Sequence, residues 1–287
     1  MENLVDLKPI ADVINTLIEK LSNACGWIVA RQTPERIAVD TLISDIQKSN
    51  LDPVNKAVLI SQAKKIIREQ TNQKAVLDNA LTSLKETAAP EKIDPDWLGQ
   101  FGDKVRFVSD ETFRFIWGKI LAQECNEPDS IPKSLLHILE QMDKEDAECF
   151  TKLCEYTMKA YDAKGNLIDY FPIIIQKKDE KAYLYGINYE KLTNLHALGL
   201  INFQSGGISV FTSTIRTFRY GEEEYNLPDD VELLNIGEVS YTKPGLALCR
   251  SVNVELHKDF LREDCIPYWE EAIKQRKEWA RFEKDVK

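Results

Sequence analysis

At 287 residues, the chain is longer than one hydrophobic core usually organises, and its length predicts two or three domains. A hydrophobic fraction of 43% with 29% charged residues is typical of a folded soluble protein. The formal net charge of −10 argues against general binding to nucleic acid, because that affinity comes largely from Lys and Arg on phosphates.

The acidic excess is concentrated in the middle of the chain. Residues 96–162 carry 8 basic and 14 acidic side chains, a balance of −6 within the total of −10. Such a surface either receives a basic partner or is a solvated helical face that aids solubility. The sequence leaves both alternatives open.

Motifs for metal, cofactor or nucleophilic chemistry are missing from the sequence. None of the six cysteines has the CxxC spacing of a zinc site, and the three histidines are isolated, so no metal and no cofactor is expected. A GxSxG elbow and a Walker lysine are also absent. The sequence shows no secretory signal and no apolar run of about 20 residues, which predicts a cytoplasmic protein with reduced thiols. We therefore expect no catalytic residues and rank an enzyme last among the function classes.

Residues 1–90 are predicted to form an N-terminal helical region. Apolar residues recur at helical spacing over the first 21 residues, and further helices are expected at 34–49 and 53–87. The first helix, within residues 4–30, has two alternative roles: it lies peripherally on a membrane surface, or it packs against a protein partner or a second subunit. Its polar face carries more acidic than basic residues, which favours packing.

The stretch "AAPEKIDPD" contains two prolines and is predicted to link this region to a helical bundle unit at 96–160. Ser109 is expected to cap a helix that ends near Cys125, and Asp143 to cap a later helix. Apolar residues at helical spacing follow both caps, so each helix should bury one face.

Residues 161–287 change to an α+β pattern and end in a helix. Strands are expected in "LIDYFPIIIQ" and "KAYLYG", which are rich in β-branched and aromatic residues. Asn188 should cap a short helix, Gly199 should end it, and residues 200–211 should form a β-hairpin around "SGG". This order of helix, glycine and hairpin is typical of a winged helix. The predicted fold class is α+β, with a helical N-terminal half, a winged-helix-like domain and a C-terminal helix.

A carboxylate ends an apolar stripe in "FIWGKILAQECNEPDSIP". Trp117 and Glu124 lie on one face of a predicted helix, with apolar residues between them at helical spacing. A buried carboxylate is costly unless it is paired or hydrogen-bonded. Backbone N–H groups near residues 130–133, or an arginine such as Arg114, should compensate. We predict that Glu124, with Trp117 and Pro132, is a structural anchor of the bend rather than a catalytic acid.

Four residues are candidate contacts to nucleic acid. Lys191 and Asn194 lie on the expected recognition helix, and Arg216 and Arg219 follow on a later strand. A single lysine opposed by Glu190 is little positive charge for a helix that faces DNA. The sequence favours a packing or protein-docking module and leaves a winged-helix DNA-binding regulator as the alternative.

The segment "FRFIWGKILAQECNEPDSIPKSLLHILEQMDKEDAECFTKL" resembles the core of an uncharacterised bacterial family of domains of unknown function. "GWIVARQTPERIAVD", with Gly26, Pro34, Arg36 and Ala38, resembles the N-terminal portion of such proteins, and "LHALGLINF" and "YTKPGLALC" resemble their winged-helix half. More remotely, the chain is similar to the Abi-alpha abortive-infection proteins. The resemblance implies a bacterial, non-enzymatic interaction protein that acts as a sensor or adaptor in defence against phage.

Overall fold

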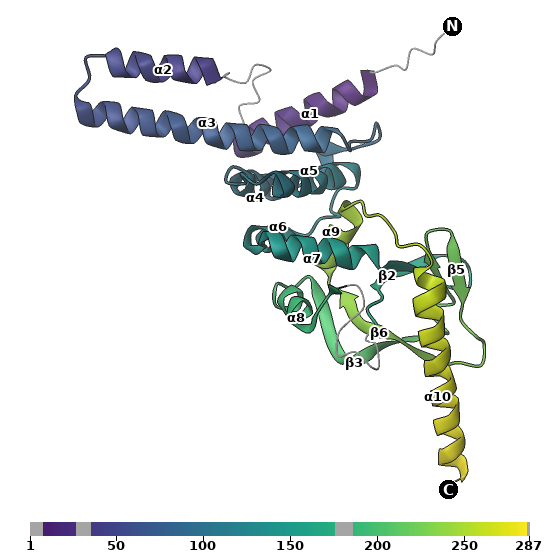
Figure 1. The fold of residues 1–287 in the computed structure, drawn as a ribbon. Helices are drawn as coiled ribbons and strands as arrows, with labels where there is room; N and C mark the ends of the chain where they lie inside the picture. Colours follow the sequence, from purple (N-terminus) through teal and green to yellow (C-terminus); the bar gives the residue numbers. More distant parts are fainter. Residues whose placement is uncertain (1–7, 27–35, 176–185, 286–287) are drawn as a thin grey trace. The chain divides into compact units, whose positions relative to one another are not determined.

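The chain divides at residue 140 into two units, 1–140 and 141–287 (Figure 1). The computed structural model describes residues 8–26, 36–175 and 186–285. Helices build the first unit, and two small antiparallel sheets with further helices build the second. The predicted α+β class, with a helical N-terminal half and a C-terminal helix, is confirmed.

The first unit is helical. Its elements are α1 (Lys8–Cys25), α2 (Arg36–Lys48), α3 (Pro53–Leu81), the short 3-10 helix η1 (Pro90–Lys92), α4 (Pro95–Val105), α5 (Glu111–Asn126) and α6 (Lys133–Gln141). α1 packs on α4, and α3 packs on α5. Leu17 and Leu21 of α1 are fully buried, so part of the apolar stripe that was predicted to meet a membrane or a partner belongs to the core of this unit.

The stretch at 88–96, predicted as a linker, is packed into the first unit. Pro90 and Ile93 are buried within it. Asp94 accepts a hydrogen bond from the backbone N–H of Asp96 at 2.8 Å and caps α4. The prolines here mark helix starts, because Pro suits the first turn of a helix.

The helix α5, which carries Trp117 and Glu124, begins one residue later than the sequence predicted. Asp110 caps it by accepting a hydrogen bond from the backbone N–H of Phe113 at 3.1 Å. The prediction that Ser109 is the cap was therefore wrong. Two neighbouring residues were both suitable caps, and only the path of the turn before the helix selects one of them.

The second unit holds the strands. Its elements are α7 (Lys144–Glu155), β1 (Thr157–Tyr161), β2 (Leu167–Pro172), α8 (Tyr189–Ala197), β3 (Ile201–Phe211), β4 (Thr217–Tyr220), β5 (Glu223–Asn226), β6 (Leu233–Tyr241), α9 (Lys243–Ser251), the π-helix η3 (Phe260–Cys265) and α10 (Ile266–Asp285). One sheet has the order β2-β1-β4-β5, and the other pairs β3 with β6. Asp143 and Asn188 cap α7 and α8, as predicted.

Trp269 of α10 is fully buried, and its ring centre lies 5.0 Å from that of Phe218 on β4 and 5.5 Å from that of Tyr225 on β5. The C-terminal helix therefore covers the four-stranded sheet.

The β-hairpin predicted at 200–211 does not form, and that prediction was wrong. The residues form one strand, β3, which pairs with the distant strand β6. Its register shifts between Phe203 and Ile208, where Gly207 has a φ of +83°. A left-handed glycine serves a bulge within a strand as well as it serves a turn.

The strand expected in "KAYLYG" lies, apart from its glycine, outside the described residues, as does most of "GWIVARQTPER".

Candidate functional site

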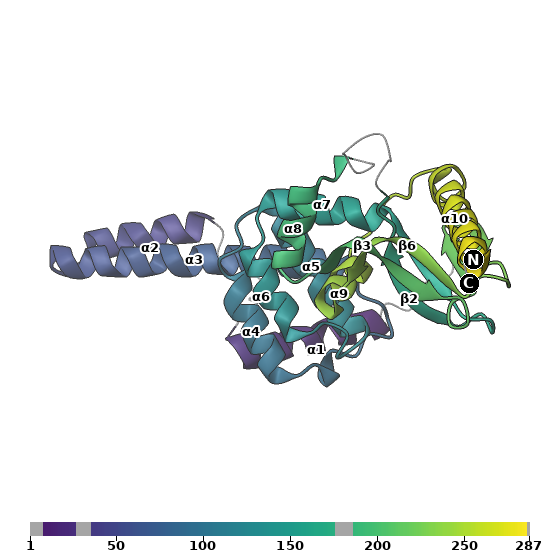
Figure 2. The same cartoon turned by 90° about the horizontal axis from the view of Figure 1, so that it is seen from below.

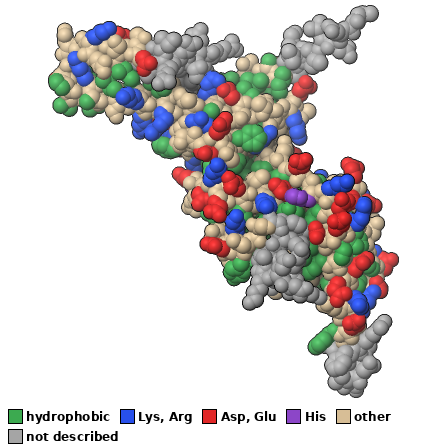
Figure 3. All heavy atoms as spheres, in the orientation of Figure 1, with side chains coloured by type: hydrophobic (Ala, Val, Ile, Leu, Met, Phe, Trp, Pro, Cys, Tyr) green, Lys and Arg blue, Asp and Glu red, His purple; other side chains and the backbone are tan. Residues whose placement is uncertain are grey.

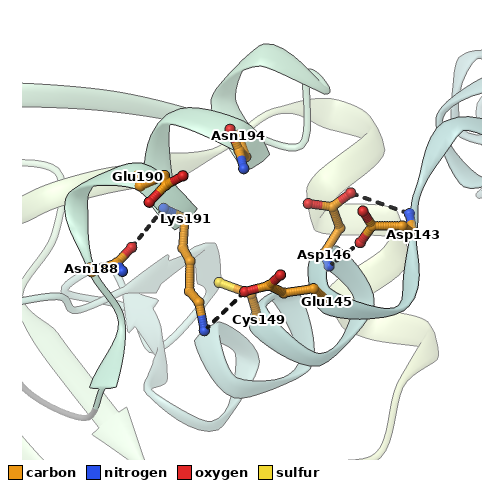
Figure 4. A pocket seen from close by; sticks show the side chains of 8 residues that line it. All are labelled: Asp143, Glu145, Asp146, Cys149, Asn188, Glu190, Lys191 and Asn194. Carbon is orange, nitrogen blue, oxygen red and sulfur yellow. Dashed lines mark hydrogen bonds and ion pairs between the residues drawn. The ribbon is translucent and has the colours of Figure 1, made fainter.

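A hollow of about 100 Å³ opens between the starts of α7 and α8 in the second unit (Figure 4). It is lined by acidic and amide side chains, one lysine and one thiol: Asp143, Glu145, Asp146, Cys149, Asn188, Glu190, Lys191 and Asn194. Four of these side chains are carboxylates and one is an ammonium group. The hollow therefore carries a surplus of negative charge, and three of its four carboxylates come from the acidic stretch 96–162.

The α7 side of the hollow is built by a reciprocal cap. Asp143 accepts a hydrogen bond from the backbone N–H of Asp146 at 2.9 Å, and the Asp146 carboxylate accepts one from the N–H of Asp143 at 3.2 Å. Partial burial raises the pKa of Asp146, and the nearby Asp143 carboxylate adds to the rise. This cap occupies one oxygen of each carboxylate and fixes both groups at the rim.

The α8 side contributes the cation. Asn188 accepts a hydrogen bond from the backbone N–H of Lys191 at 2.8 Å, which starts α8 and fixes the first turn. The Lys191 ammonium then reaches Glu145 on α7, with 3.7 Å between Nζ and Oε1. Because the Glu145 side chain is 74% exposed, it remains accessible to a group from outside.

Cys149, at the floor of the hollow, is buried. Burial raises the pKa of this thiol to about 11, with the Lys191 charge opposing the rise. A thiol with such a pKa is protonated near neutral pH and is a poor nucleophile. The hollow is therefore suited to binding rather than to covalent chemistry.

The charge balance indicates what such a hollow can bind. Each helix start adds a partial positive charge of roughly +0.5, which helps to hold the carboxylates in place. One lysine and two helix ends do not neutralise four carboxylates. A guanidinium or ammonium group from a partner would find charge-assisted acceptors there, and the volume admits such a head group but not a drug-sized ligand.

The structure separates the four candidate nucleic-acid contacts into two places. Lys191 and Asn194 lie together at the hollow, whereas Arg216 and Arg219 lie at the strand β4. Arg216 forms an ion pair with Asp229, and the Arg219 Nε lies 3.2 Å from the nearest carboxylate oxygen of Glu224. Each of the three cations therefore has a carboxylate partner within its own unit.

The predicted anchor Glu124 lies in the first unit and is 1% exposed. Its Oε1 accepts a hydrogen bond from the backbone N–H of Asp129, and its Oε2 accepts one from that of Ile131, both at 2.8 Å. Burial raises the pKa of Glu124, although these two N–H groups oppose the rise. Of the two predicted kinds of compensation, backbone N–H groups hold the carboxylate, and Arg114 instead donates to the Val108 carbonyl oxygen at 3.1 Å.

The other two anchor residues lie on either side of this carboxylate. Trp117 is buried, and its ring meets that of Phe101 edge-on with the centres 5.4 Å apart. Pro132 directly precedes α6, after the bend that Glu124 holds. The carbonyl oxygen of Ile131, in the same bend, accepts a hydrogen bond from the Trp97 indole at 3.0 Å.

A second, more open hollow of about 360 Å³ lies beside the π-helix η3 in the second unit. His257 lines it, and its Nε2 lies 2.8 Å from Oε2 of Glu155, which is 102 positions earlier in the sequence. Tyr220 links the same segments, because it donates to the Glu155 carbonyl oxygen (2.6 Å) and accepts from the N–H of His257 (2.7 Å). Sequence reasoning treated His257 as isolated and missed this pair, since no local motif signals it. These hydrogen bonds connect the segments to one another and give the pair a structural role.

Within residues 8–26, 36–175 and 186–285, which the structure describes, no group of three or more His, Cys, Asp or Glu side chains could hold a metal ion. None of the helices there is both long enough and apolar enough to cross a bilayer.

The sequence matches a family model over most of its length. A family model described as "Protein of unknown function (DUF2806)" matches residues 60–263, which confirms the expected membership in an uncharacterised domain family. No curated protein and no solved structure matches the chain. The similarity to Abi-alpha proteins stays a prediction.

Proposed function

We propose that this chain, which belongs to the family described as Protein of unknown function (DUF2806), is a non-enzymatic interaction protein. One observation carries the proposal: the acidic hollow between α7 and α8 has four carboxylates, a single lysine and an exposed Glu145. A surface of this kind attracts a cationic segment of a partner and disfavours phosphate.

The alternative, a DNA-binding regulator that uses residues 188–220, has weaker support. Phosphate would have to displace Glu145 from Lys191, and it would then meet Glu190 on the same helix turn. Arg216 and Arg219 would have to leave their own carboxylate partners. Each displacement leaves like charges facing one another, which costs free energy.

The biological setting that we propose is defence against phage, with the chain as a cytoplasmic sensor or adaptor. Its support is the remote resemblance of the sequence to Abi-alpha abortive-infection proteins. The acidic hollow supplies the surface through which an adaptor would hold a partner.

A pull-down from the native host, with and without phage infection, tests the proposal with two matched variants. Replacing Glu145 and Glu190 with glutamine removes two charges from the hollow, whereas Glu148→Gln removes an exposed charge from α7 outside the lining. We expect the first variant to bind a basic partner roughly five- to thirty-fold more weakly, at about 0.5–1 kcal/mol per lost pair. The second variant should bind like the natural chain, and added salt should weaken all three.

The same experiment can support the regulator instead. Duplex DNA would then be recovered in place of a protein, with a recovery that falls steeply as salt rises and that drops further in Lys191→Ala. Stronger DNA recovery with the Glu145/Glu190 variant would also support a DNA-binding regulator, because it would mean that these two carboxylates hinder the binding of phosphate. Either result would overturn the proposed function.

A further inference from the structure

Two thiols meet inside the second unit. Cys154 lies in the last turn of α7 and Cys249 in the last turn of α9, and both helices can be followed in Figure 2. The two side chains hydrogen-bond to one another, although the residues are far apart in the sequence. Folding therefore brings two sulfur atoms together, which a disulfide requires.

Two hydroxyl groups adjoin this pair of thiols. The Tyr241 hydroxyl lies 3.6 Å from Cys154 Sγ and 2.7 Å from Thr157 Oγ1. Both hydroxyls also hydrogen-bond to the sulfur of Cys249. We call Cys154, Thr157, Tyr241 and Cys249 the thiol cluster. Its members come from α7, β1, β6 and α9, so the packing of these elements holds the two sulfur atoms in place.

The two sulfur atoms have different surroundings. Cys154 is 2% exposed, whereas Cys249 is half-buried and stays partly accessible to solvent. The hydrogen bond from the Cys154 thiol holds the pKa of the Cys249 thiol below its ordinary value of 9.0, although burial opposes this. Burial raises the pKa of the Cys154 thiol well above 9.0. An accessible thiol of lowered pKa next to a second thiol is the arrangement of a redox-sensing cysteine and its resolving partner.

The other four cysteines, all in the described part of the chain, have a different electrostatic environment. Burial raises the pKa of each of their thiols: Cys25, Cys125, Cys149 and Cys265. Cys25 is half-buried like Cys249, but its pKa rises to about 11. Exposure alone therefore does not set Cys249 apart, whereas the hydrogen-bond donors around its sulfur do.

A metal ion is the other common use of paired thiols. Structural zinc takes four ligands from Cys, His or carboxylate side chains. Among the residues that the structure describes, no group of three or more such side chains could hold a metal ion, so the two thiols have no third ligand of this kind. The thiol cluster therefore suits oxidation better than metal binding.

We infer that Cys249 and Cys154 form a reversible disulfide when the chain meets hydrogen peroxide. The Cys249 thiolate attacks one peroxide oxygen, the O–O bond breaks, and the second oxygen leaves as water with the proton that Cys249 has lost. The sulfur of Cys154 then attacks the sulfur of the resulting sulfenic acid. Its hydroxyl group leaves as water with the Cys154 proton. In total, two thiols are oxidised to one disulfide, and one peroxide is reduced to two water molecules.

The surroundings of the thiols favour a small, neutral oxidant. Residues 141–287 carry 26 acidic and 20 basic side chains, and Figure 3 shows acidic groups spread over the second unit. This charge repels an anionic oxidant such as oxidised glutathione, which is also bulky for a half-buried thiol. The disulfide does not depend on the proposed function, because none of the four residues of the thiol cluster lines the acidic hollow.

Mass spectrometry of the full chain, treated with hydrogen peroxide and then with an alkylating agent, tests the inference. We expect a peptide cross-linked between Cys154 and Cys249 that disappears on treatment with a thiol reductant. In Cys154→Ser, the sulfenic acid on Cys249 should persist and be trapped by dimedone. The matched control Cys25→Ser removes another half-buried thiol and should form the cross-link like the natural chain.

The rates of alkylation by iodoacetamide give a second measurement, which needs no variant. The pKa of Cys249 lies below 9.0 and that of Cys25 is about 11, so near neutral pH the thiolate fraction of Cys249 is larger by about a hundredfold or more. A more acidic thiol is also a weaker nucleophile, which reduces the expected advantage to roughly tenfold. Peptide mapping of the reduced natural chain follows both residues in one sample.

Several results would overturn the inference. One is a natural chain in which peroxide leaves a dimedone-reactive sulfenic acid on Cys249 without any cross-link, because the two sulfur atoms would then not meet. Others are a disulfide that joins different cysteines, no cross-link at peroxide concentrations that oxidise Cys25, and equal alkylation of Cys249 and Cys25. A cross-link that oxidised glutathione forms and hydrogen peroxide does not would overturn the choice of oxidant.

Discussion

Replacing Gly245 with alanine should unfold the second unit at temperatures where the natural chain stays folded. Gly245 lies in the first turn of α9, and a Cβ there would sit 2.8 Å from the carbonyl carbon of Leu200 and closer still to its oxygen. Leu200 is held in place, because its oxygen accepts a hydrogen bond from the N–H of Thr242, the cap of α9, at 3.1 Å. We expect the free energy of unfolding to fall by at least ~3 kcal/mol and the Tm by about 10 °C in a thermal melt of the full chain.

Gly206→Ala is the matched control within the same unit. A Cβ at this position meets no atom within 4 Å. Its free energy of unfolding should stay within about 1 kcal/mol of that of the natural chain. Equal melting of the Gly245 and Gly206 variants would show that α9 does not approach Leu200 this closely.

The second large effect should follow the removal of the buried carboxylate in Glu124→Ala. The substitution leaves the N–H groups of Asp129 and Ile131 without their acceptor in a buried place. Each unsatisfied N–H costs about 1–3 kcal/mol, so we expect a loss of roughly 2–6 kcal/mol and a Tm several degrees lower. Hydrogen-exchange mass spectrometry should locate the lost protection at the bend between α5 and α6.

Two comparisons make the Glu124 experiment specific. Glu124→Gln keeps the volume and one acceptor oxygen but places an amide N–H₂ against a backbone N–H, so about half of the loss should remain. Glu127→Ala removes an exposed carboxylate three residues further on and should change the Tm little. Unchanged melting of Glu124→Ala together with a lost binding partner would contradict the structural anchor and give this carboxylate a functional role.

The raised pKa of Glu124 predicts a pH dependence of stability. Between its ordinary value of 4.5 and its higher value in the folded chain, the folded state binds more protons at this group than the unfolded state does. The contribution of Glu124 to the free energy of unfolding is therefore fully present below 4.5 and declines as the pH rises through the higher value. Urea unfolding at several pH values gives the free energies of unfolding of the natural chain and of Glu124→Gln. The other carboxylates contribute equally to both proteins, so the difference between the two free energies isolates the contribution of Glu124. A difference that grows with rising pH would contradict the predicted sign.

Features that depend on neighbouring residues were predictable from the sequence. Asp143 and Asn188 cap their helices through N–H groups only three residues away, so residue type and spacing are enough to identify them. The α+β class and the closing helix follow from periodicity in the same way. The β3 bulge was missed because its glycines also suit a turn, and the strand that pairs with them lies about 30 residues further on.

Only part of the candidate site could be predicted from the sequence in this way. Counting charges located the acidic stretch, but Lys191 was considered only as a candidate nucleic-acid contact, because its ion-pair partner Glu145 is distant in the sequence. The His257–Glu155 pair was missed for the same reason. The exposed apolar residues of α2 and α3 also read as an ordinary amphipathic pattern, since periodicity cannot say whether another helix covers them.

The sequence by itself determined that the chain is acidic and belongs to the α+β class, that its N-terminal half is helical, and that Asp143 and Asn188 cap their helices. The tertiary structure decided which carboxylates surround Lys191, which N–H groups hold Glu124, and which apolar side chains remain exposed. The reason is physical: caps and periodicity act between residues a few positions apart, whereas burial and charge pairing depend on distances between segments that only folding brings together.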